Sequence, residues 1–171
     1  MEWRTAAIWS AVFFGLLGYM VMRAAAGKAL FLNTRTPKIY LFHCANGYDY
    51  AEVMRGCSQH INEMKIIPLP CSGKLDILYL TKAFDAGADG AVIMVCKEGE
   101  CRHMEGNLRA KKRAQAIDAL LQETGLGPDR ILVIQLDDGG IADALSKLED
   151  FRLQIQTILQ NDPAVEPAQT T

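Results

Sequence analysis

Cysteine is the residue type that gives this sequence its clearest chemistry. Four of its five cysteines come directly after, or close behind, short apolar runs that predict β-strands, namely Cys44, Cys71, Cys96 and Cys101. Because the carboxyl ends of parallel strands meet at one edge of a sheet, we expect these thiols to converge. Four thiolates are the ligand set of an iron–sulfur cluster or of a structural zinc ion. The spacing fits no zinc ribbon, and a thioredoxin-like C-x-x-C motif is absent.

The fifth cysteine and two nearby histidines carry weaker signals. Cys57 lies on the apolar face of a predicted helix over 49–64, which indicates a packing role. His43 precedes Cys44, and His103 follows Cys101 by two residues. Either histidine could tune a cluster or replace a ligand, as in Rieske centres. A hydrogen-bonding or surface role is the simpler interpretation of both.

A basic stretch starts beside Cys101 and continues along the next predicted helix, and it comprises Arg102, Arg109, Lys111, Lys112 and Arg113. It could dock an acidic partner protein, or it could be an ordinary solvated helix face. The whole chain has a formal net charge of −2, which gives it no general attraction for nucleic acid.

Strand and helix patterns alternate along the chain behind the first 37 residues. The predicted strands cover 38–43, 65–69, 91–95 and 130–136, and the predicted helices cover 49–64, 75–86, 107–124 and 141–159. The strands are nearly continuous apolar runs, as expected where helices cover both faces of a parallel sheet. The pattern predicts a small α/β fold in three layers, flavodoxin-like or Rossmann-like, with ligands bound beyond the carboxyl ends of the strands.

The first part of the chain has a different composition. No charged residue occurs between Thr5 and Met22, and Trp3, Trp9 and Tyr19 lie where interfacial anchors would be. We interpret this run as one transmembrane helix in contact with the lipid bilayer; a buried core helix and a cleavable signal peptide are the alternatives. The predicted organisation is a membrane anchor over 1–32, a linker over 33–37, a domain over 38–160 and a flexible tail over 161–171.

The distribution of basic residues around the predicted span indicates its orientation. Only Arg4 precedes the span, whereas Arg23, Lys28, Arg35 and Lys38 follow it. The more basic flank of a membrane helix stays in the cytoplasm, so we expect a single-pass protein of the cell inner membrane with a cytoplasmic domain. An odd number of cysteines agrees with a reducing compartment.

From about Lys38 to Phe151 the sequence resembles the delta subunit of methyl-viologen-reducing hydrogenase, also called the hydrogenase iron–sulfur subunit family. The resemblance rests on a set of short motifs: Cys44 at a strand end, C-S-G at 71–73, A-F-x-x-G-A-D-G at 83–90, C-x-x-G-x-C at 96–101 with His103, G-N at 106–107, and Arg113. It implies a cytoplasmic 2Fe–2S protein that passes electrons between a partner oxidoreductase and a heterodisulfide-reductase-type flavoprotein.

Two features depart from that family. Its members usually have C-x-x-C after the first strand, and here Gly47 stands where the second cysteine belongs. The family members also lack the predicted anchor, so the partner here is expected to be a membrane complex, with a quinone pool as the end point of the electrons.

Three hypotheses follow for function. The leading one is a membrane-anchored electron-transfer subunit, with no substrate site of its own, whose 2Fe–2S cluster is held by Cys44, Cys71, Cys96 and Cys101. A second is a cluster-free structural subunit that keeps the fold only to bind partner subunits, and Gly47 favours it. A third is a thiol–disulfide relay between Cys96 and Cys101.

Overall fold

The structure is a computed structural model that describes residues 35–60, 62–137 and 139–161. They belong to one compact unit, which begins at Arg35. The Arg35 guanidinium pairs with the carboxylate of Asp89, and the backbone N–H of Lys38 donates to the same carboxylate at 2.8 Å. These two contacts hold the segment that precedes β1 against the rest of the domain, beginning at Arg35.

Four parallel strands form the sheet, as the sequence predicted. They are β1 (Ile39–Cys44), β2 (Met64–Leu69), β3 (Gly90–Val95) and β4 (Ile131–Gln135). Their order is β2-β1-β3-β4, and Ile39 lies opposite both Met64 and Gly90. This is the strand order of flavodoxin-type sheets without a fifth strand. The point where the order reverses lies between β1 and β3.

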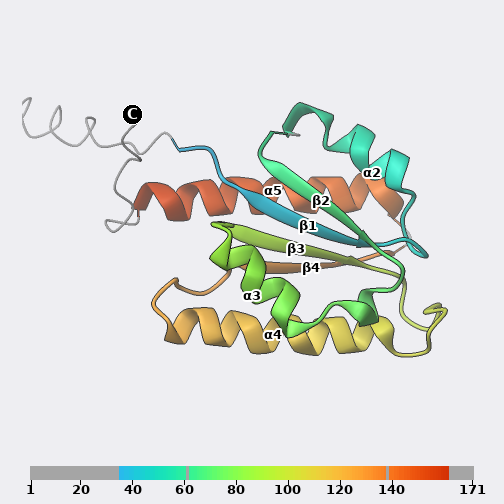
Figure 1. Ribbon diagram of the computed structural model, residues 1–171. Helices are drawn as coiled ribbons and strands as arrows, with labels where there is room; N and C mark the ends of the chain where they lie inside the picture. Colours follow the sequence, from blue (N-terminus) through green and yellow to red (C-terminus); the bar gives the residue numbers. More distant parts are fainter. Residues whose placement is uncertain (1–34, 61, 138, 162–171) are drawn as a thin grey trace, which may run out of the picture. The chain divides into compact units, whose positions relative to one another are not determined.

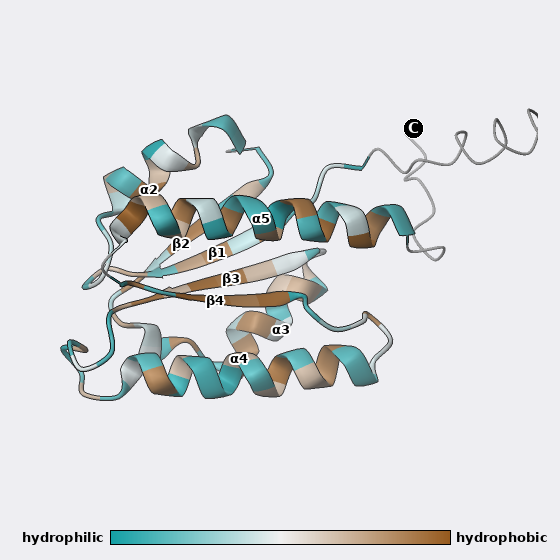
Figure 2. Cartoon of the chain, turned by 180° about the vertical axis from the view of Figure 1, so that it is seen from behind, coloured by the Kyte–Doolittle hydropathy of each residue, from teal (hydrophilic) through white to brown (hydrophobic). Residues whose placement is uncertain are grey.

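Helices cover both faces of the sheet, which gives three layers (Figure 1). The α-helices within the described residues are α2 (Tyr50–Gly56), α3 (Ile77–Asp85), α4 (Gly106–Glu123) and α5 (Gly140–Asn161). Helices α2 and α5 pack on one face, and α3 and α4 pack on the other. The strands are the most hydrophobic elements, whereas α4 and α5 alternate between polar and apolar residues (Figure 2).

Side chains of β1 alternate between the two apolar layers. Ile39 and Leu41 belong to the layer under α2 and α5, and Tyr40 and Phe42 belong to the layer under α3 and α4. Because successive side chains of a strand point to opposite faces, His43 and Cys44 continue this alternation. Cys44 is therefore directed to the α3/α4 side of the sheet, and His43 to the α2/α5 side.

The prediction of one helix over 49–64 was wrong. Helix α2 begins after Asp49, whose carboxylate accepts a hydrogen bond from the backbone N–H of Ala51 at 2.6 Å, and it ends at Gly56. A 3-10 turn follows at Ser58–His60, and Met64 already pairs with Ile39 as the first residue of β2. Glycine is a poor residue for a helix interior, and the sheet register requires Met64 to be extended. The apolar residues do recur at helical spacing along the sequence, but they belong to two different elements, α2 and β2.

Within the described ranges, no helix has the length and apolar character needed to span a bilayer. The segment 5–22, on which the transmembrane prediction rests, lies outside them, as does the tail from residue 162. The anchor stays a prediction.

Candidate functional site

The four strand-end cysteines all lie at the carboxyl edge of the sheet. Cys44 is the last residue of β1, and Cys96 directly follows β3, so these two flank the point where the strand order reverses. Cys71 caps the start of a 3-10 turn, η3 (Ser72–Lys74), and Cys101 lies in the loop before α4. Cys101 is partly exposed, and the other three are buried.

The structure brings these four thiols close enough to influence one another. The Cys96 thiol interacts with the thiols of Cys44 and Cys101, and the Cys71 thiol interacts with those of Cys101 and Cys44. Burial raises the pKa of both Cys96 and Cys71, and the neighbouring thiols raise each further. Without a cation, thiolates crowded in this way repel one another.

Cys101 has a different electrostatic environment. Its burial acts to raise its pKa, but backbone N–H groups of Asn107, His103 and Gly106 bond to the sulfur, and the net result is a lowered pKa. Two of these donors belong to the first turn of α4, where N–H groups have no partner within the helix. The start of α4 thus stabilises negative charge on the Cys101 sulfur.

Gly106 is the point at which two cysteine loops meet. A Cβ atom at this position would lie 2.6 Å from the Cys71 Sγ and 3.2 Å from the Cys101 Sγ. The backbones also touch here, since a Cβ at Gly73 would lie 2.8 Å from the Gly106 Cα. Only glycine leaves room for both sulfur atoms beside the start of α4.

Asn107 braces the loop that carries Cys96 and Cys101. Its side chain is buried, and its Nδ2 donates to the backbone oxygens of Cys96 at 3.4 Å and Lys97 at 3.3 Å. These bonds attach the end of β3 to the first turn of α4.

Arg113 braces the Cys71 loop in the same way. Its guanidinium donates to the backbone oxygens of Gly73 at 2.9 Å and Leu75 at 2.6 Å. The side chain is partly buried, so it is a structural member of the site rather than a free docking charge. Lys111 likewise contacts Gln135 and lies 3.8 Å from a Glu98 carboxylate oxygen. The basic stretch is therefore not one uniform surface.

Gly47, where the resemblance leads one to expect a second cysteine, packs directly on the site. A Cβ there would lie 2.9 Å from the Cys96 Cα. The neighbouring Asn46 donates from Nδ2 to the Pro70 backbone oxygen at 2.7 Å, which ties the loop after β1 to the residue before Cys71. The small residue at position 47 lets this loop close over Cys96.

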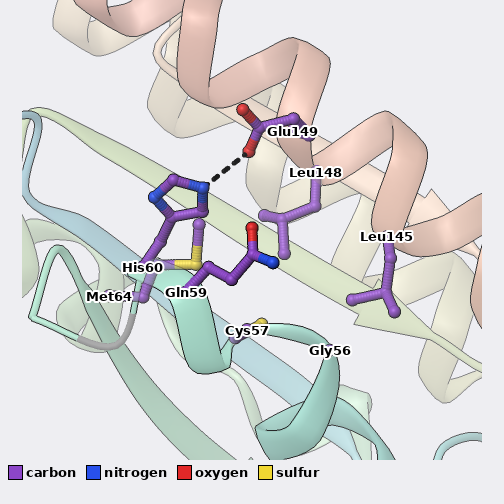
Figure 3. A pocket seen from close by; sticks show the side chains of 8 residues that line it. All are labelled: Gly56, Cys57, Gln59, His60, Met64, Leu145, Leu148 and Glu149. Atoms are coloured by element: carbon purple, nitrogen blue, oxygen red, sulfur yellow. Dashed lines mark ion pairs between the residues drawn. The ribbon is translucent and has the colours of Figure 1, made fainter.

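Cys57 lies apart from the other cysteines, in the apolar layer between the sheet and α5. Its side chain is 1% exposed, and burial raises its pKa to about 11. It lines a hollow of about 300 Å³ between the end of α2 and α5, where His60 lies 3.5 Å from a Glu149 oxygen (Figure 3). Its burial agrees with the packing role that the sequence indicated.

The two histidines beside the cysteines lie in different surroundings. His43 is fully buried on the opposite side of the sheet, where it stacks on Tyr50 with ring centroids 5.5 Å apart. Within the described part of the chain, neither of its ring nitrogens has a hydrogen-bond partner, and burial lowers its pKa. His103 contributes its backbone N–H to Cys101, and its side chain is exposed.

No three histidine, cysteine or carboxylate side chains among residues 35–60, 62–137 and 139–161 form a group that could hold one metal ion. The four thiolates of a binuclear cluster are divided between two irons and need not meet at one point.

Comparisons with known proteins agree with this architecture. The family model of the methyl-viologen-reducing hydrogenase delta subunit matches residues 39–158, from the first residue of β1 into α5. The vhu iron-sulfur subunit of the F420-non-reducing hydrogenase of Methanocaldococcus jannaschii is 42% identical over 98 residues, which cover 56% of this chain and 72% of the relative. The protein with the same description in Methanococcus maripaludis is 32% identical over 120 residues, covering 67% and 89%.

A third relative is a much longer protein. This subunit of the ferredoxin:CoB-CoM heterodisulfide reductase of Methanosarcina mazei is 32% identical over 102 residues, which are 58% of this chain but 13% of the relative. The matched part thus exists as a segment of a large protein as well as in the form of a small subunit. With a family model that spans the whole sheet and the four cysteine positions, the chain belongs to the methyl-viologen-reducing hydrogenase delta subunit family.

Proposed function

We propose that this chain is an electron-transfer subunit of a larger redox complex, and that Cys44, Cys71, Cys96 and Cys101 hold a 2Fe–2S cluster. The observation that carries the proposal is the convergence of four thiols from three separate loops at the switch point of the sheet. When bound, such a cluster accepts and releases one electron at a time.

The residues around the thiols suit a cluster. Four thiolates are the complete ligand set that a 2Fe–2S cluster requires, so Gly47 removes no necessary ligand. The Gly73 N–H donates to the Cys71 Sγ at 3.3 Å, and the first turn of α4 donates to the Cys101 sulfur. Hydrogen bonds to thiolate sulfur stabilise its charge and tune the reduction potential of a cluster. Burial of the other three cysteines excludes water.

The names of the relatives support the same role. Several are iron-sulfur subunits of hydrogenases, and others are heterodisulfide reductase subunits in which the matched segment is a small part. We infer that the partners are other subunits of a redox complex, either a heterodisulfide-reductase-like protein or a quinone-linked membrane module. The chain relays electrons between them and has no substrate site of its own.

The anchor and the location are part of this proposal. The uncharged run from Thr5 to Met22 is long enough to cross a bilayer, and the basic residues that follow it favour a cytoplasmic domain. The complex then lies at the cell inner membrane.

Iron and acid-labile sulfide analysis of anaerobically purified protein tests the proposal, and we expect about two of each per chain. Serine at any one of the four cysteines should lower the iron content and alter the visible absorption and the EPR signal of the reduced protein. The matched control is Cys57→Ser, which should leave both spectra unchanged because Cys57 lies in the other apolar layer. Wild-type protein without iron would refute the cluster and favour the cluster-free structural role.

One observation favours a second candidate function, a thiol–disulfide relay. The thiols of Cys96 and Cys101 lie close enough to shift each other's pKa, and Cys101 is partly exposed. In such a relay the two thiols lose two electrons and two protons to a disulfide of a partner protein, which is reduced to two thiols. An iron-free protein whose Cys96–Cys101 disulfide forms reversibly would establish this relay instead.

A further inference from the structure

A second hollow lies directly beside the cysteine site. Its volume is about 290 Å³, and its walls include Cys71, Gly106 and the side chains of Lys74, His103 and Arg109. Gly106 contacts the sulfurs of both Cys71 and Cys101. The hollow therefore lies on the same side of the site as Cys101, which is the most exposed of the four cysteines.

The hollow is electrically positive. Lys74 and Arg109 bring two permanent cations to its wall, and none of the described residues that line it is a carboxylate. Arg109 lies in the first turn of α4, which contains no acidic residue. A cation at the positive end of a helix dipole is unfavourable for the helix. Arg109 therefore adds positive charge to a place that is already positive. Glu105 approaches Arg109 only at 3.8 Å, in a largely exposed pair that contributes little.

An exposed apolar side chain lies in the loop that leads from Cys101 into α4. Met104 is 87% exposed and has a φ of 66°, in the left-handed region that non-glycine residues rarely adopt. Its backbone N–H donates to the Cys101 oxygen at 2.9 Å, which fixes this conformation in the loop between Cys101 and α4. Leu108, one turn further on, is 39% exposed. Strained conformations of this kind persist mainly at functional sites, and methionine is common at adaptable binding surfaces.

We propose that this hollow is the docking site for an acidic segment of a partner protein in the complex, with a carboxylate between Lys74 and Arg109 and an apolar side chain against Met104. The inference rests on the proposed function, because it makes this face the entry or exit point for single electrons of the cluster. The positive hollow orients the partner, and the apolar contact holds it beside Cys101. No atom is transferred, and one electron passes between the partner's redox centre and the cluster.

Carbodiimide cross-linking of the complex extracted in mild detergent tests the contact directly, because this reagent joins a lysine amine to a carboxylate with no spacer. We expect mass spectrometry to find Lys74 joined to an Asp or Glu of another subunit. A Lys74→Arg variant should keep the complex but lose that product. If Lys74 forms no cross-link while the exposed lysines elsewhere on the domain do, the docking site is elsewhere and the proposal fails.

Small redox probes test the charge of the hollow on the isolated holoprotein. Oxidation of the reduced cluster by ferricyanide should slow about tenfold at low salt in the double variant Lys74→Glu/Arg109→Glu, and oxidation by hexaamminecobalt(III) should accelerate. The matched control is Arg55→Glu/Lys82→Glu, which changes the net charge equally at exposed positions on α2 and at the far end of α3. Equal effects of both double variants would mean that only net charge matters and would overturn the proposal.

A third measurement does not depend on the cluster. In the cluster-free protein, the rate of Cys101 alkylation by anionic iodoacetate relative to neutral iodoacetamide should fall about threefold in the Lys74→Glu/Arg109→Glu variant, but not in the control. An unchanged ratio would refute the positive hollow. Absence of iron from the wild-type protein would instead refute the proposed function, so the two failures are distinguishable.

Discussion

Gly106 determines how closely the two most accessible sulfurs can lie to α4. In most helices an alanine in place of glycine stabilises the protein, by about 0.5–1 kcal/mol in a helix interior. At position 106 the added methyl group would meet the Cys71 sulfur at 2.6 Å and the Cys101 sulfur at 3.2 Å. The residue is therefore required by the space that the thiols occupy, and its backbone N–H is also a donor to Cys101.

We predict that Gly106→Ala separates folding from cluster binding. The variant should keep a cooperative urea transition, because α4 gains a better helix-forming residue, but iron content and visible absorption should fall strongly as the sulfurs are displaced. Lys112→Ala, an exposed position on the same helix, is the control and should retain the cluster. A Gly106→Ala protein with full iron content would show that the sulfurs have room to spare.

At the scale of elements, α4 is the helix that holds the cysteine-bearing loops in place. Its first turn provides Gly106 and Asn107, and one face of its second turn provides Arg113, so this helix contacts every loop that bears Cys71, Cys96 or Cys101. Asn107 and Arg113 both donate to backbone oxygens, so these contacts do not depend on which side chains the loops carry. Loops alone would leave the thiols free to separate.

Arg113→Met should loosen the Cys71 loop. The variant removes both bonds from the guanidinium to the Gly73 and Leu75 oxygens, at a cost of about 1.5–3 kcal/mol for a charged donor. Hydrogen exchange of residues 72–75 should accelerate, and iron content should decrease. Lys112→Met, the exposed neighbour, changes the charge equally and should affect neither measurement. A protected 72–75 segment in Arg113→Met would mean that α4 does not brace this loop.

Cys57, on the opposite face of the sheet, should make the stability of the domain depend on pH. Its pKa is raised from 9.0 to about 11 by burial, so between these values the unfolded chain ionises this thiol while the folded protein keeps it protonated. Stability from Cys57 is therefore lost as pH rises above about 9, by at most about 1.4 kcal/mol per pH unit. Urea unfolding of cluster-free Cys57→Ala should show a shallower decline from pH 9 to 11 than the wild type. Parallel declines would contradict this burial.

The elements also show what sequence patterns can and cannot specify. The strands were placed within one residue at either end, because each is a short apolar run bounded by polar or glycine residues. The helix over 49–64 failed because apolar spacing continues from α2 through a 3-10 turn into β2. The convergence of the cysteines followed from the parallel sheet alone. The roles of Asn107 and Arg113 did not, because their acceptors are backbone oxygens distant in sequence, and Arg113 resembles an ordinary surface charge.

At the scale of the whole molecule, the described domain begins at Arg35 and the predicted anchor lies before it. We predict that the full chain stays in the membrane fraction after alkaline carbonate washing, and that a chain starting at Arg35 is released. Green fluorescent protein fused after Thr171 should fluoresce, and alkaline phosphatase fused there should be inactive, since the basic flank favours the cytoplasm. Active phosphatase would reverse the orientation, and an unfolded shortened chain would assign residues 1–34 to the core.

The two ends of the domain's chain leave from the same end of the sheet (Figure 1). Arg35 to Lys38 lead into the start of β1, and the last turns of α5 pack there too, since Leu159 shares an apolar layer with Ile39 and Ile155 contacts Gly90 at the start of β3. The cysteine edge is at the other end of the sheet, because Cys44 ends β1 and Cys96 follows β3. Because both ends of the chain leave the domain away from the cysteines, other segments can be joined to it without entering the thiol edge, which fits a relative in which the matched segment makes up 13% of the protein.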